Sequence, residues 1–439
     1  MNKRIVVLGA GISGIGAAVL AKKKGFNVFV SDKGVITAEN KTVLLNNEIK
    51  WEEGKHTLDK ILNADEVIKS PGISDEIDVI QKLHKEGISV ISEVEFAFRY
   101  TNAKIAAITG SNGKTTTTLL LQKILKNASY DVLVAGNVGV SFARSIAERD
   151  YDFIVLELSS FQLDGIKNFR SDIAILLNIT PDHLDRYDNK LEKYAASKFR
   201  ITANQTENDV LILNADDRIV NKISTKAKKI PISLVNRLNE GGYLNKNELI
   251  ININNKTMIM QELALQGKHN IFNSMAAAIA GRVFEVKDSV IRQSMIDFQN
   301  LEHRLEYVLT VHGIDFINDS KATNVNACWF ALESMKKDIV WIAGGVDKGN
   351  DYSELYEMVT NKVRAIICLG ERNQNLISAF KGKVDTIVQA SSMDEAVNQA
   401  YSLGKKGEIV LLSPACASFD LFSNYEDRGF QFKKAVRVL

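Results

Sequence analysis

The chain has 439 residues, of which 45% are hydrophobic and 25% are charged. This ordinary composition excludes a disordered, collagen-like or coiled-coil protein, and the length predicts about three domains. The 55 lysines and arginines nearly balance the 53 aspartates and glutamates, so a general polyanion binder is excluded and any phosphate recognition must be local.

The first apolar run of the chain, Ile5–Leu8, follows Lys3 and Arg4 and faintly resembles the start of a signal peptide. Glycines interrupt the apolar region that a signal peptide would need, and no run approaches the roughly 18 residues that span a bilayer. The three cysteines are far apart and predict neither a disulfide framework nor a zinc site. We therefore expect a soluble cytoplasmic protein.

Short apolar runs alternate with amphipathic stretches along almost the whole chain. Runs of three to five residues are typical of strands that are buried on both faces of a sheet. The alternation predicts an α/β protein with mostly parallel sheets. The predicted strands include 5–8, 28–30, 105–108, 153–156, 173–177, 339–342, 365–369 and 409–412, and the Asn-rich segment 245–256 predicts further strands joined by turns.

The glycine motif Gly9-Ala10-Gly11-Ile12-Ser13-Gly14 comes directly after the first strand and opens a helix. Asp32 follows 18 residues after Gly14, at the end of the second strand. Glycines in this context let backbone amides approach a pyrophosphate at a helix N-terminus. The motif predicts a nucleotide or diphosphate site, although a tight strand-to-helix turn without a ligand has the same pattern.

A second glycine loop, Gly110-Ser111-Asn112-Gly113-Lys114-Thr115-Thr116, follows the strand 105–108. Its backbone amides would cradle the phosphates of ATP, Lys114 would reach the β and γ oxygens, and Thr115 would contact Mg²⁺. Only two residues separate the glycines, where four are usual.

Two further residues follow strands near this loop. Glu157 ends the strand 153–156 and is placed to hold Mg²⁺. His183 lies in a loop after the strand 173–177, where a histidine is more often a surface residue than a ligand.

Polar residues also follow three strands near the C-terminus. These segments are 318–324, 344–349 and 413–420. A helix cap is the simplest use of such residues, but the density of Asp, Lys and hydroxyl side chains favours an anion site, such as one for a carboxylated substrate.

The phosphate loop resembles that of the Mur ligase family, the ATP-dependent amide ligases of peptidoglycan precursor synthesis. The resemblance extends over nearly the whole chain, through Gly136–Gly139, Glu157–Leu163, His303-Arg304, Asp319–Asn324 and Ser413–Ser418. The last two segments are similar to the members that add D-glutamate to UDP-N-acetylmuramoyl-L-alanine. Sister ligases for other amino acids carry different sequences at the positions of Asp319–Asn324.

The resemblance implies three domains: a Rossmann-like domain for the UDP-substrate (1–95), a central P-loop ATPase-like domain for ATP and magnesium (96–300) and a Rossmann-like domain for the amino acid (301–439). The UDP-substrate residues that it implies are Ser13, Gly14, Ile15, Asp32, Lys33, Ser70, Pro71, Gly72, Asn137 and His183. Those for ATP, besides residues 110–116, are Asn270, Asn273, Arg304 and Asp319. Those for D-glutamate are Lys321, Thr323, Lys348, Ser418 and Tyr425, the last in place of an expected phenylalanine.

The family also implies two Mg²⁺ ions held by Thr115, Glu157, His183 and Lys198, with Lys198 carbamylated by CO₂. Lys198 lies in an amphipathic helical segment, where a lysine is usually only solvated. The catalytic residues implied are Lys114, His183 and Lys198. His183 is assigned no proton transfer, because a metal-bound imidazole is a poor base.

The activity implied is formation of an acyl phosphate on UDP-N-acetylmuramoyl-L-alanine and its attack by D-glutamate, in a monomer that binds neither nucleic acid nor membrane. A sister ligase with another amino acid is the nearest alternative. An NAD(P) or flavin oxidoreductase would explain the first glycine motif, but it leaves Lys114 and Glu157 unexplained. A non-catalytic nucleotide-binding regulator would lack the loop lysine or the metal carboxylate, and both are present.

Overall fold

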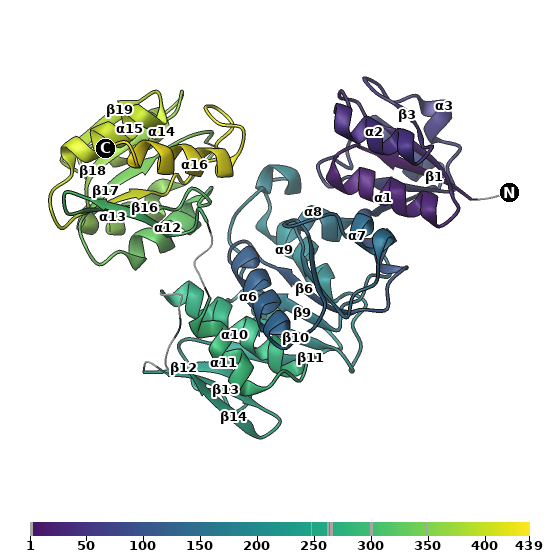
Figure 1. The fold of residues 1–439 in the computed structure, drawn as a ribbon, viewed down its shortest axis with the longest axis horizontal. Helices are drawn as coiled ribbons and strands as arrows, with labels where there is room; N and C mark the ends of the chain where they lie inside the picture. The colour runs from purple at the N-terminus through teal and green to yellow at the C-terminus, as the bar shows by residue number, and fades with distance from the viewer. Residues whose placement is uncertain (1–2, 247, 261–262, 264–266, 299–301, 348) are drawn as a thin grey trace. The chain divides into compact units, whose positions relative to one another are not determined.

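The computed structural model describes residues 3–246, 248–260, 263, 267–298, 302–347 and 349–439 (Figure 1). They form two compact units. The first unit contains the described residues up to Leu263 together with Asn270–Asp297, and the second contains the remaining described residues, to Leu439. The predicted boundary at 300/301 lies outside the described residues.

The first unit begins with a five-stranded parallel sheet of order β3-β2-β1-β4-β5. This is the Rossmann strand order without its sixth strand, and ligands bind such sheets outside the carboxyl ends of the strands. The elements are β1 (Arg4–Leu8), α1 (Ile12–Lys23), β2 (Asn27–Ser31), α2 (Ala38–Asn46), β3 (Lys50–Glu52), α3 (Leu58–Ile61), β4 (Glu66–Lys69), α4 (Asp78–Lys85), β5 (Ser89–Ser92) and α5 (Glu93–Phe98).

The second sheet of this unit has nine strands in the order β14-β13-β12-β11-β10-β9-β6-β8-β7. The seven strands β6 to β12 pair in parallel with their neighbours. Strand β13 pairs antiparallel with both β12 and β14. The Asn-rich segment forms these last strands, as predicted, with Asn254 and Asn255 at positive φ in the β13–β14 turn.

The parallel part of this sheet carries most of the helices of the unit. Its elements are β6 (Lys104–Thr109), α6 (Lys114–Asn127), β7 (Val132–Gly136), α7 (Phe142–Glu148), β8 (Phe153–Glu157), α8 (Ser160–Asp164), β9 (Ile173–Leu176), η1 (Leu184–Tyr187), α9 (Leu191–Phe199), η2 (Arg200–Thr202), β10 (Val210–Asn214), η3 (Val220–Lys222), β11 (Lys228–Ser233), β12 (Gly241–Asn245), β13 (Glu248–Ile253), β14 (Lys256–Met260), α10 (Lys268–Val283) and α11 (Asp288–Ile296).

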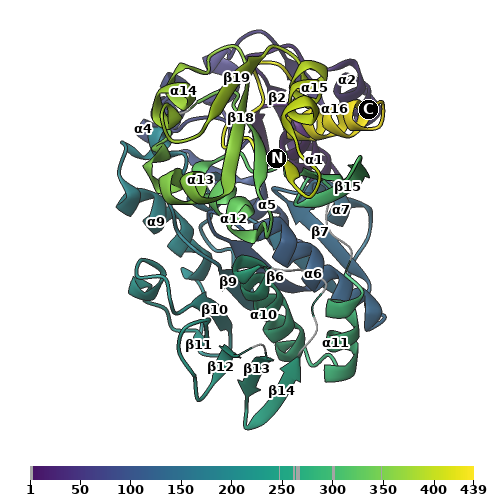
Figure 2. The same cartoon turned by 90° about the vertical axis from the view of Figure 1, so that its left-hand side faces the viewer.

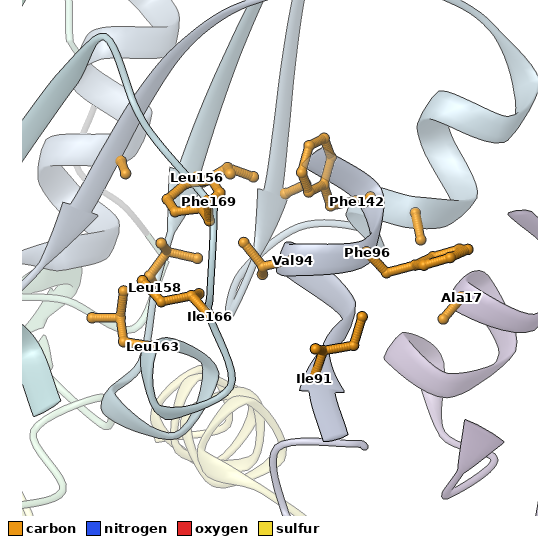
Figure 3. Packing of buried hydrophobic residues seen from close by; sticks show 14 of the residues in the cluster. Ala17, Ile91, Val94, Phe96, Phe142, Leu156, Leu158, Leu163, Ile166 and Phe169 are labelled. Carbon is orange, nitrogen blue, oxygen red and sulfur yellow. The ribbon is translucent and has the colours of Figure 1, made fainter. Parts of the chain in front are cut away.

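One hydrophobic cluster joins these two sheets. It contains Ala17 of α1, Phe96 of α5, Phe142 of α7 and Leu156 of β8, all of them buried. Figure 3 shows these side chains in one packed group. The sheets of the first and second predicted domains therefore share a core, and α1, α5 and α7 lie where they meet.

The second unit contains a six-stranded sheet of order β15-β16-β20-β17-β18-β19, in which only β15 pairs antiparallel. Apolar residues on alternate positions of its central strands feed two clusters. One packs against α12, α13 and α14, and the other against α15 and α16 (Figures 1 and 2). The sheet therefore has helices on both faces, as its continuous apolar strands predict.

The elements of the second unit follow in the order of the chain. They are β15 (Glu306–Val311), β16 (Ile314–Asn318), α12 (Val325–Ser334), β17 (Ile339–Ala343), η4 (Tyr352–Leu355), α13 (Tyr356–Lys362), β18 (Val363–Leu369), α14 (Gln374–Phe380), β19 (Thr386–Ala390), α15 (Met393–Leu403), β20 (Ile409–Leu412) and α16 (Tyr425–Val436).

The prediction of an α/β architecture of three domains with mostly parallel sheets is confirmed by the three sheets, and the eight predicted strands named by range all form, with the fifth ending at Leu176. Among the residues that the structure describes, no helix combines the length and the apolar character needed to cross a bilayer.

Candidate active site

The phosphate loop connects β6 to α6, and its two glycines adopt positive φ, 153° at Gly110 and 87° at Gly113. A Cβ on Gly113 would overlap Oδ1 of Asn273, and one on Gly110 would lie 3.0 Å from Cβ of Leu177. A side chain at either position would therefore be strained and crowded. The closeness of Gly113 also places Asn273, a predicted ATP residue, directly against the loop.

The loop is fixed by the segment that follows β9. The backbone N–H of Asn112 donates to Oδ1 of Asn178 at 2.8 Å, and the Asn178 amide donates back to the Asn112 carbonyl at 3.0 Å. The Ser111 hydroxyl donates to the Thr180 carbonyl at 2.8 Å and accepts from the Thr180 N–H at 2.9 Å. These reciprocal bonds fix the loop to the segment that follows β9.

Two lysines converge on one carbonyl of the loop. Nζ of Lys114 donates to the carbonyls of Gly110 and Ser111, each at 2.8 Å, and Nζ of Lys198 donates to the Gly110 carbonyl at 2.9 Å. Lys198 is 1% exposed, and its Nζ lies 4.5 Å from the ring centroid of Tyr194. The helix α9 therefore directs Lys198 into the site, although its sequence gives no sign of this.

The charge of this pair has a clear consequence. Burial, and next the nearby Lys114 ammonium, lower the pKa of Lys198 well below its usual value. The nearby carboxylates of Asp182, Asp164 and Glu157 oppose this shift. The two converging ammonium groups are suited to binding an anion at the loop.

Glu157, at the end of β8, is 2% exposed. Its Oε1 accepts a hydrogen bond from the Asn137 amide at 2.7 Å, and its buried Oε2 has no hydrogen-bond partner among the described residues. A buried carboxylate oxygen without a donor is costly unless a cation binds it, and carboxylate oxygen is a ligand that Mg²⁺ prefers. Glu157 therefore fits a magnesium site.

The other predicted metal ligands lie around the same loop but complete no cluster. His183 has φ of 53°, and its ring packs edge-on against Phe161 with centroids 5.3 Å apart. Thr115 is buried in the first turn of α6. Among the described residues, no group of three or more His, Cys, Asp and Glu side chains converges on one point, so a hydroxyl, a modified lysine or the substrate would have to supply the remaining ligands.

The glycine loop after β1 has a different electrostatic character. Asp32 accepts the backbone N–H of Ala10 at 2.6 Å through Oδ2 and that of Gly34 at 2.7 Å through Oδ1. A Cβ on Gly14 would overlap the Gly9 carbonyl oxygen. The Ser70 hydroxyl donates to that carbonyl at 3.5 Å. The carboxyl ends of β1, β2 and β4 thus meet at one edge of the sheet, with Asp32 bracing two loops.

The predicted UDP-substrate residues fall mostly at this edge. Lys33 and Gly72 are exposed, and Ser13, Ser70 and Pro71 are half-buried. Ile15 is 6% exposed and belongs to the hydrophobic core, so its backbone is the part that faces this edge. Asn137 lies in the first unit as well, at the carboxyl end of β7.

Asp319, in the second unit, draws three segments together. Its Oδ2 accepts from the Ser413 hydroxyl at 2.9 Å, and its Oδ1 accepts from the Leu305 N–H at 3.2 Å. Burial raises the pKa of Asp319 to about 7, against the opposing effect of the Arg304 charge and of these bonds. The two predicted ATP residues of this unit, Arg304 and Asp319, are therefore close enough to interact.

The predicted D-glutamate residues are gathered by a buried arginine. Arg428 donates to the carbonyl of Ser320 at 2.8 Å and to the carbonyl of Cys416 at 3.1 Å. Beside them, Nζ of Lys321 lies 5.2 Å from the ring centroid of Tyr425. Thr323 is half-buried and Ser418 is 2% exposed. Lys348 lies outside the described residues.

Several residues that shape these sites were not predicted from the sequence. Asn178 donates to the Asn112 carbonyl of the phosphate loop, and Asn40 donates to the Ala10 carbonyl at 2.8 Å. Arg428 donates to the Ser320 carbonyl and so connects α16 to the segment after β16. Asn178 alone had a usable signal, since it is a polar residue at the carboxyl end of a predicted strand. The others lie on helices, where their spacing is that of ordinary polar residues.

Comparison with known proteins agrees with this geometry. Three family models match the chain: the MurD N-terminal domain over residues 4–79, the Mur ligase middle domain over 108–281 and the glutamate ligase domain of Mur ligases over 303–416. Asn137, Glu157, His183 and Lys198 lie within the second of these matches, and Asp319 and Lys321 lie within the third.

Full-length relatives extend the likeness. The UDP-N-acetylmuramoylalanine--D-glutamate ligases of Christiangramia forsetii and Bacteroides thetaiotaomicron are 55% and 53% identical to this chain over 445 and 444 residues, and each match covers 100% of both chains. The structure of the MurF ligase from Thermotoga maritima in complex with ADP shares the fold, with a TM-score of 0.64 at 15% identity, over 96% of this chain and 99% of that one.

Proposed function

The chain belongs to the Mur ligase family, and from this membership we propose that it joins D-glutamate to UDP-N-acetylmuramoyl-L-alanine, with conversion of ATP to ADP and phosphate. The observation that carries the proposal is the 55% identity over the full length to a ligase named for this reaction. The geometry of the phosphate loop supports the ATP-dependent step independently of that identity.

The reaction proceeds in two steps. The carboxylate of the UDP-substrate attacks the γ-phosphorus of ATP, and ADP leaves. The amine of D-glutamate then attacks the acyl carbon, loses a proton, and phosphate leaves. Phosphorylation is needed because a free carboxylate has only oxide as its leaving group. Lys114 stabilises the charge on the transferring phosphoryl group, and the protein mainly positions the reactants and excludes water.

Magnesium would bind at Glu157, whose buried Oε2 lacks a partner, with Thr115, His183 and a carbamylated Lys198 as further ligands. When bound, Mg²⁺ neutralises charge on the phosphates. Two ions are proposed, as the family resemblance implies.

The carbamate on Lys198 is the finer part of the proposal. An amine must be uncharged to attack CO₂, and burial lowers the pKa of Lys198 in the required direction. The nitrogen–carbon bond forms as one proton leaves, so that a cation becomes an anionic oxygen ligand. Activity should therefore fall in CO₂-free buffer and return when bicarbonate is added; activity that is independent of bicarbonate would contradict the carbamate.

The substrate residues stay as predicted from the sequence. The UDP-substrate would bind at the carboxyl edge of the first sheet and at Asn137, adenine at Asn270 and Asn273, the ribose at Asp319, and D-glutamate at the segments gathered by Arg428. The domains 1–95, 96–300 and 301–439 would divide these tasks. We propose the cytoplasm as the location and a monomer as the active form, without a nucleic acid or membrane partner.

The experiment is phosphate release from ATP and Mg²⁺ with UDP-N-acetylmuramoyl-L-alanine, adding D-glutamate, L-glutamate, meso-diaminopimelate or L-lysine in turn. Release that depends on D-glutamate alone supports the proposal. Release with another amino acid would identify a sister ligase. No release with any of them would refute the ligase reaction with this UDP-substrate.

A further inference from the structure

Glu93 is a carboxylate that no step of the proposed reaction uses. It is the first residue of α5, the helix that follows the last strand of the first sheet, and it is 3% exposed. A buried carboxylate is unfavourable unless hydrogen bonds or a proton compensate for the lost hydration. Its partners therefore indicate why it is there.

The first set of partners belongs to the second sheet. Oε1 of Glu93 accepts a hydrogen bond from the hydroxyl of Ser141 and another from the N–H of Ala143, at 3.0 Å. Ser141 is the N-cap of α7, where its hydroxyl oxygen also accepts from the Arg144 N–H at 3.0 Å. Glu93 thus fixes the position at which α7 begins.

The glycine loop of the first sheet lies next to this contact. Ser13, in the first turn of α1, is close enough to Glu93 to lower the pKa of its carboxyl group, against the larger effect of burial, which raises it. One helical turn later, α1 lies so close to α7 that a Cβ on Gly16 would overlap the Ser141 hydroxyl. The carboxyl group that fixes the start of α7 therefore lies where α7 packs against the first turns of α1.

The segment between β7 and α7 connects this contact to the metal carboxylate. It begins at Asn137, which donates to Glu157 at 2.7 Å, and it ends at Ser141. Its ends are thereby held by two buried carboxylates, Glu157 at one end and Glu93 at the other. The position of Asn137 relative to Ser13 depends on both.

We propose that Glu93 is a positioning residue for the UDP-substrate: it sets the distance between Ser13 on the first sheet and Asn137 on the second. The inference rests on the proposed function only in taking these two residues as contacts of that substrate. Glu93 touches no reacting atom and acts through the two loops. Losing it should weaken binding of the UDP-substrate and leave the phosphate loop intact.

Glu95 supplies a matched control on the same helix. It is 0% exposed, and its Oε2 accepts the backbone N–H groups of Lys167, Asn168 and Phe169 at 2.9, 2.9 and 2.8 Å. These bonds anchor α5 to a segment that carries no predicted substrate residue. Glu95→Gln should therefore lower the thermal midpoint without a specific effect on the UDP-substrate.

The test is calorimetric titration of the full-length protein with UDP-N-acetylmuramoyl-L-alanine, without ATP or D-glutamate, followed by steady-state kinetics. For Glu93→Gln we expect a Kd about ten-fold higher, because the Ser141 hydroxyl and the Ala143 N–H would then donate to a neutral amide oxygen, and such bonds are about half as strong as those to a carboxylate. The KM for the UDP-substrate should rise in parallel, while kcat and the KM for ATP change less than about two-fold. Glu95→Gln should leave this Kd unchanged.

Equal Kd values for folded Glu93→Gln and the wild type would overturn the inference, as would equal increases in Glu93→Gln and Glu95→Gln. If Glu93→Gln does not fold, Ser141→Ala tests the same link, and an unchanged Kd in that variant would overturn it. A wild type that binds the UDP-substrate but does not ligate D-glutamate would refute the proposed function and still allow the Kd comparison. A wild type that does not bind it would overturn both.

Discussion

The first unit contains two glycine loops with the same architecture and opposite charge. Each follows a parallel strand, opens a helix, and contains a glycine whose Cβ would collide with a neighbour, Gly14 with the Gly9 carbonyl and Gly113 with Asn273. The loop after β1 is braced by a carboxylate, Asp32. The loop after β6 is approached by two lysines, Lys114 and Lys198.

The difference between the side chains around the two loops shows that the backbone provides an anion site, whereas the side chains determine which anion it binds. Amides at a helix N-terminus suit any phosphate. Converging ammonium groups and a buried carboxylate with a free oxygen, that of Glu157, suit a triphosphate with its magnesium. A loop braced by Asp32 suits a diphosphate that reacts no further.

The largest expected effect separates the two loops by charge. Lys114→Ala removes the cation from the path of the transferring phosphoryl group, and turnover should fall at least about 10³-fold, measured as phosphate release. Lys33→Ala, beside the other loop, should change only the KM for the UDP-substrate, by a few-fold. Near-normal turnover in Lys114→Ala would refute its assignment.

Glu157→Gln should come next. The amide keeps an acceptor for Asn137 but loses the charge that would bind Mg²⁺, so kcat should fall about 10²-fold. The Mg²⁺ concentration for half-maximal activity should rise, which a titration of activity against Mg²⁺ measures. Asp32→Asn is the control in the other loop and should leave the Mg²⁺ requirement unchanged. An unchanged requirement in Glu157→Gln would exclude it as a metal ligand.

Backbone geometry can be tested within one loop. Gly14→Ala places a methyl group on the Gly9 carbonyl, whereas a Cβ on Gly11 meets nothing within 4 Å. Gly14→Ala should therefore raise the KM for the UDP-substrate about ten-fold or more with little change in the KM for ATP, and Gly11→Ala should change both KM values less than about two-fold. Equal behaviour of the two variants would show that the close approach at Gly14 has no role in binding.

The two loops also show what sequence could predict. Both were identified with their correct strands and helices, because glycine, lysine and strand ends are local features. Asp32 was predicted as a ligand contact, and the structure adds its role as a brace between Ala10 and Gly34. Ile15 stays a predicted contact, and because its side chain is in the core, the contact would be made by its backbone.

The shared core and the burial of Lys198 and Glu93 depend on tertiary structure, and the pattern of apolar and polar residues in the sequence does not predict them. Apolar strands predict burial but not the partner, so the shared core of the first two sheets was not foreseen. Lys198 was named only through family resemblance, because a lysine on an amphipathic helix is normally solvated. Glu93 sits in a stretch with Glu95 and Arg99 that resembles an exposed helix, and only its neighbours across the two sheets show that it is buried.

The smallest expected effect concerns a second bracing carboxylate, Asp319, which accepts from Leu305 N–H and Ser413 as Asp32 does from Ala10 and Gly34. Burial raises the pKa of Asp319 from 3.8 to about 7. Between these values the folded state binds more protons than the unfolded state, so this group makes the protein less stable as pH rises from about 4 to about 7.

Asp319→Asn removes that dependence. The thermal midpoint of the variant minus that of the wild type should increase by about 3 °C between pH 5 and pH 7.5 and then level off. Since the Ser413 hydroxyl lowers the pKa of Asp319, Ser413→Ala should move the window to higher pH, because the carboxyl then keeps its proton longer. A difference between Asp319→Asn and the wild type that stays constant across this range would show that Asp319 is ionised throughout, and that it braces its loop as a charge.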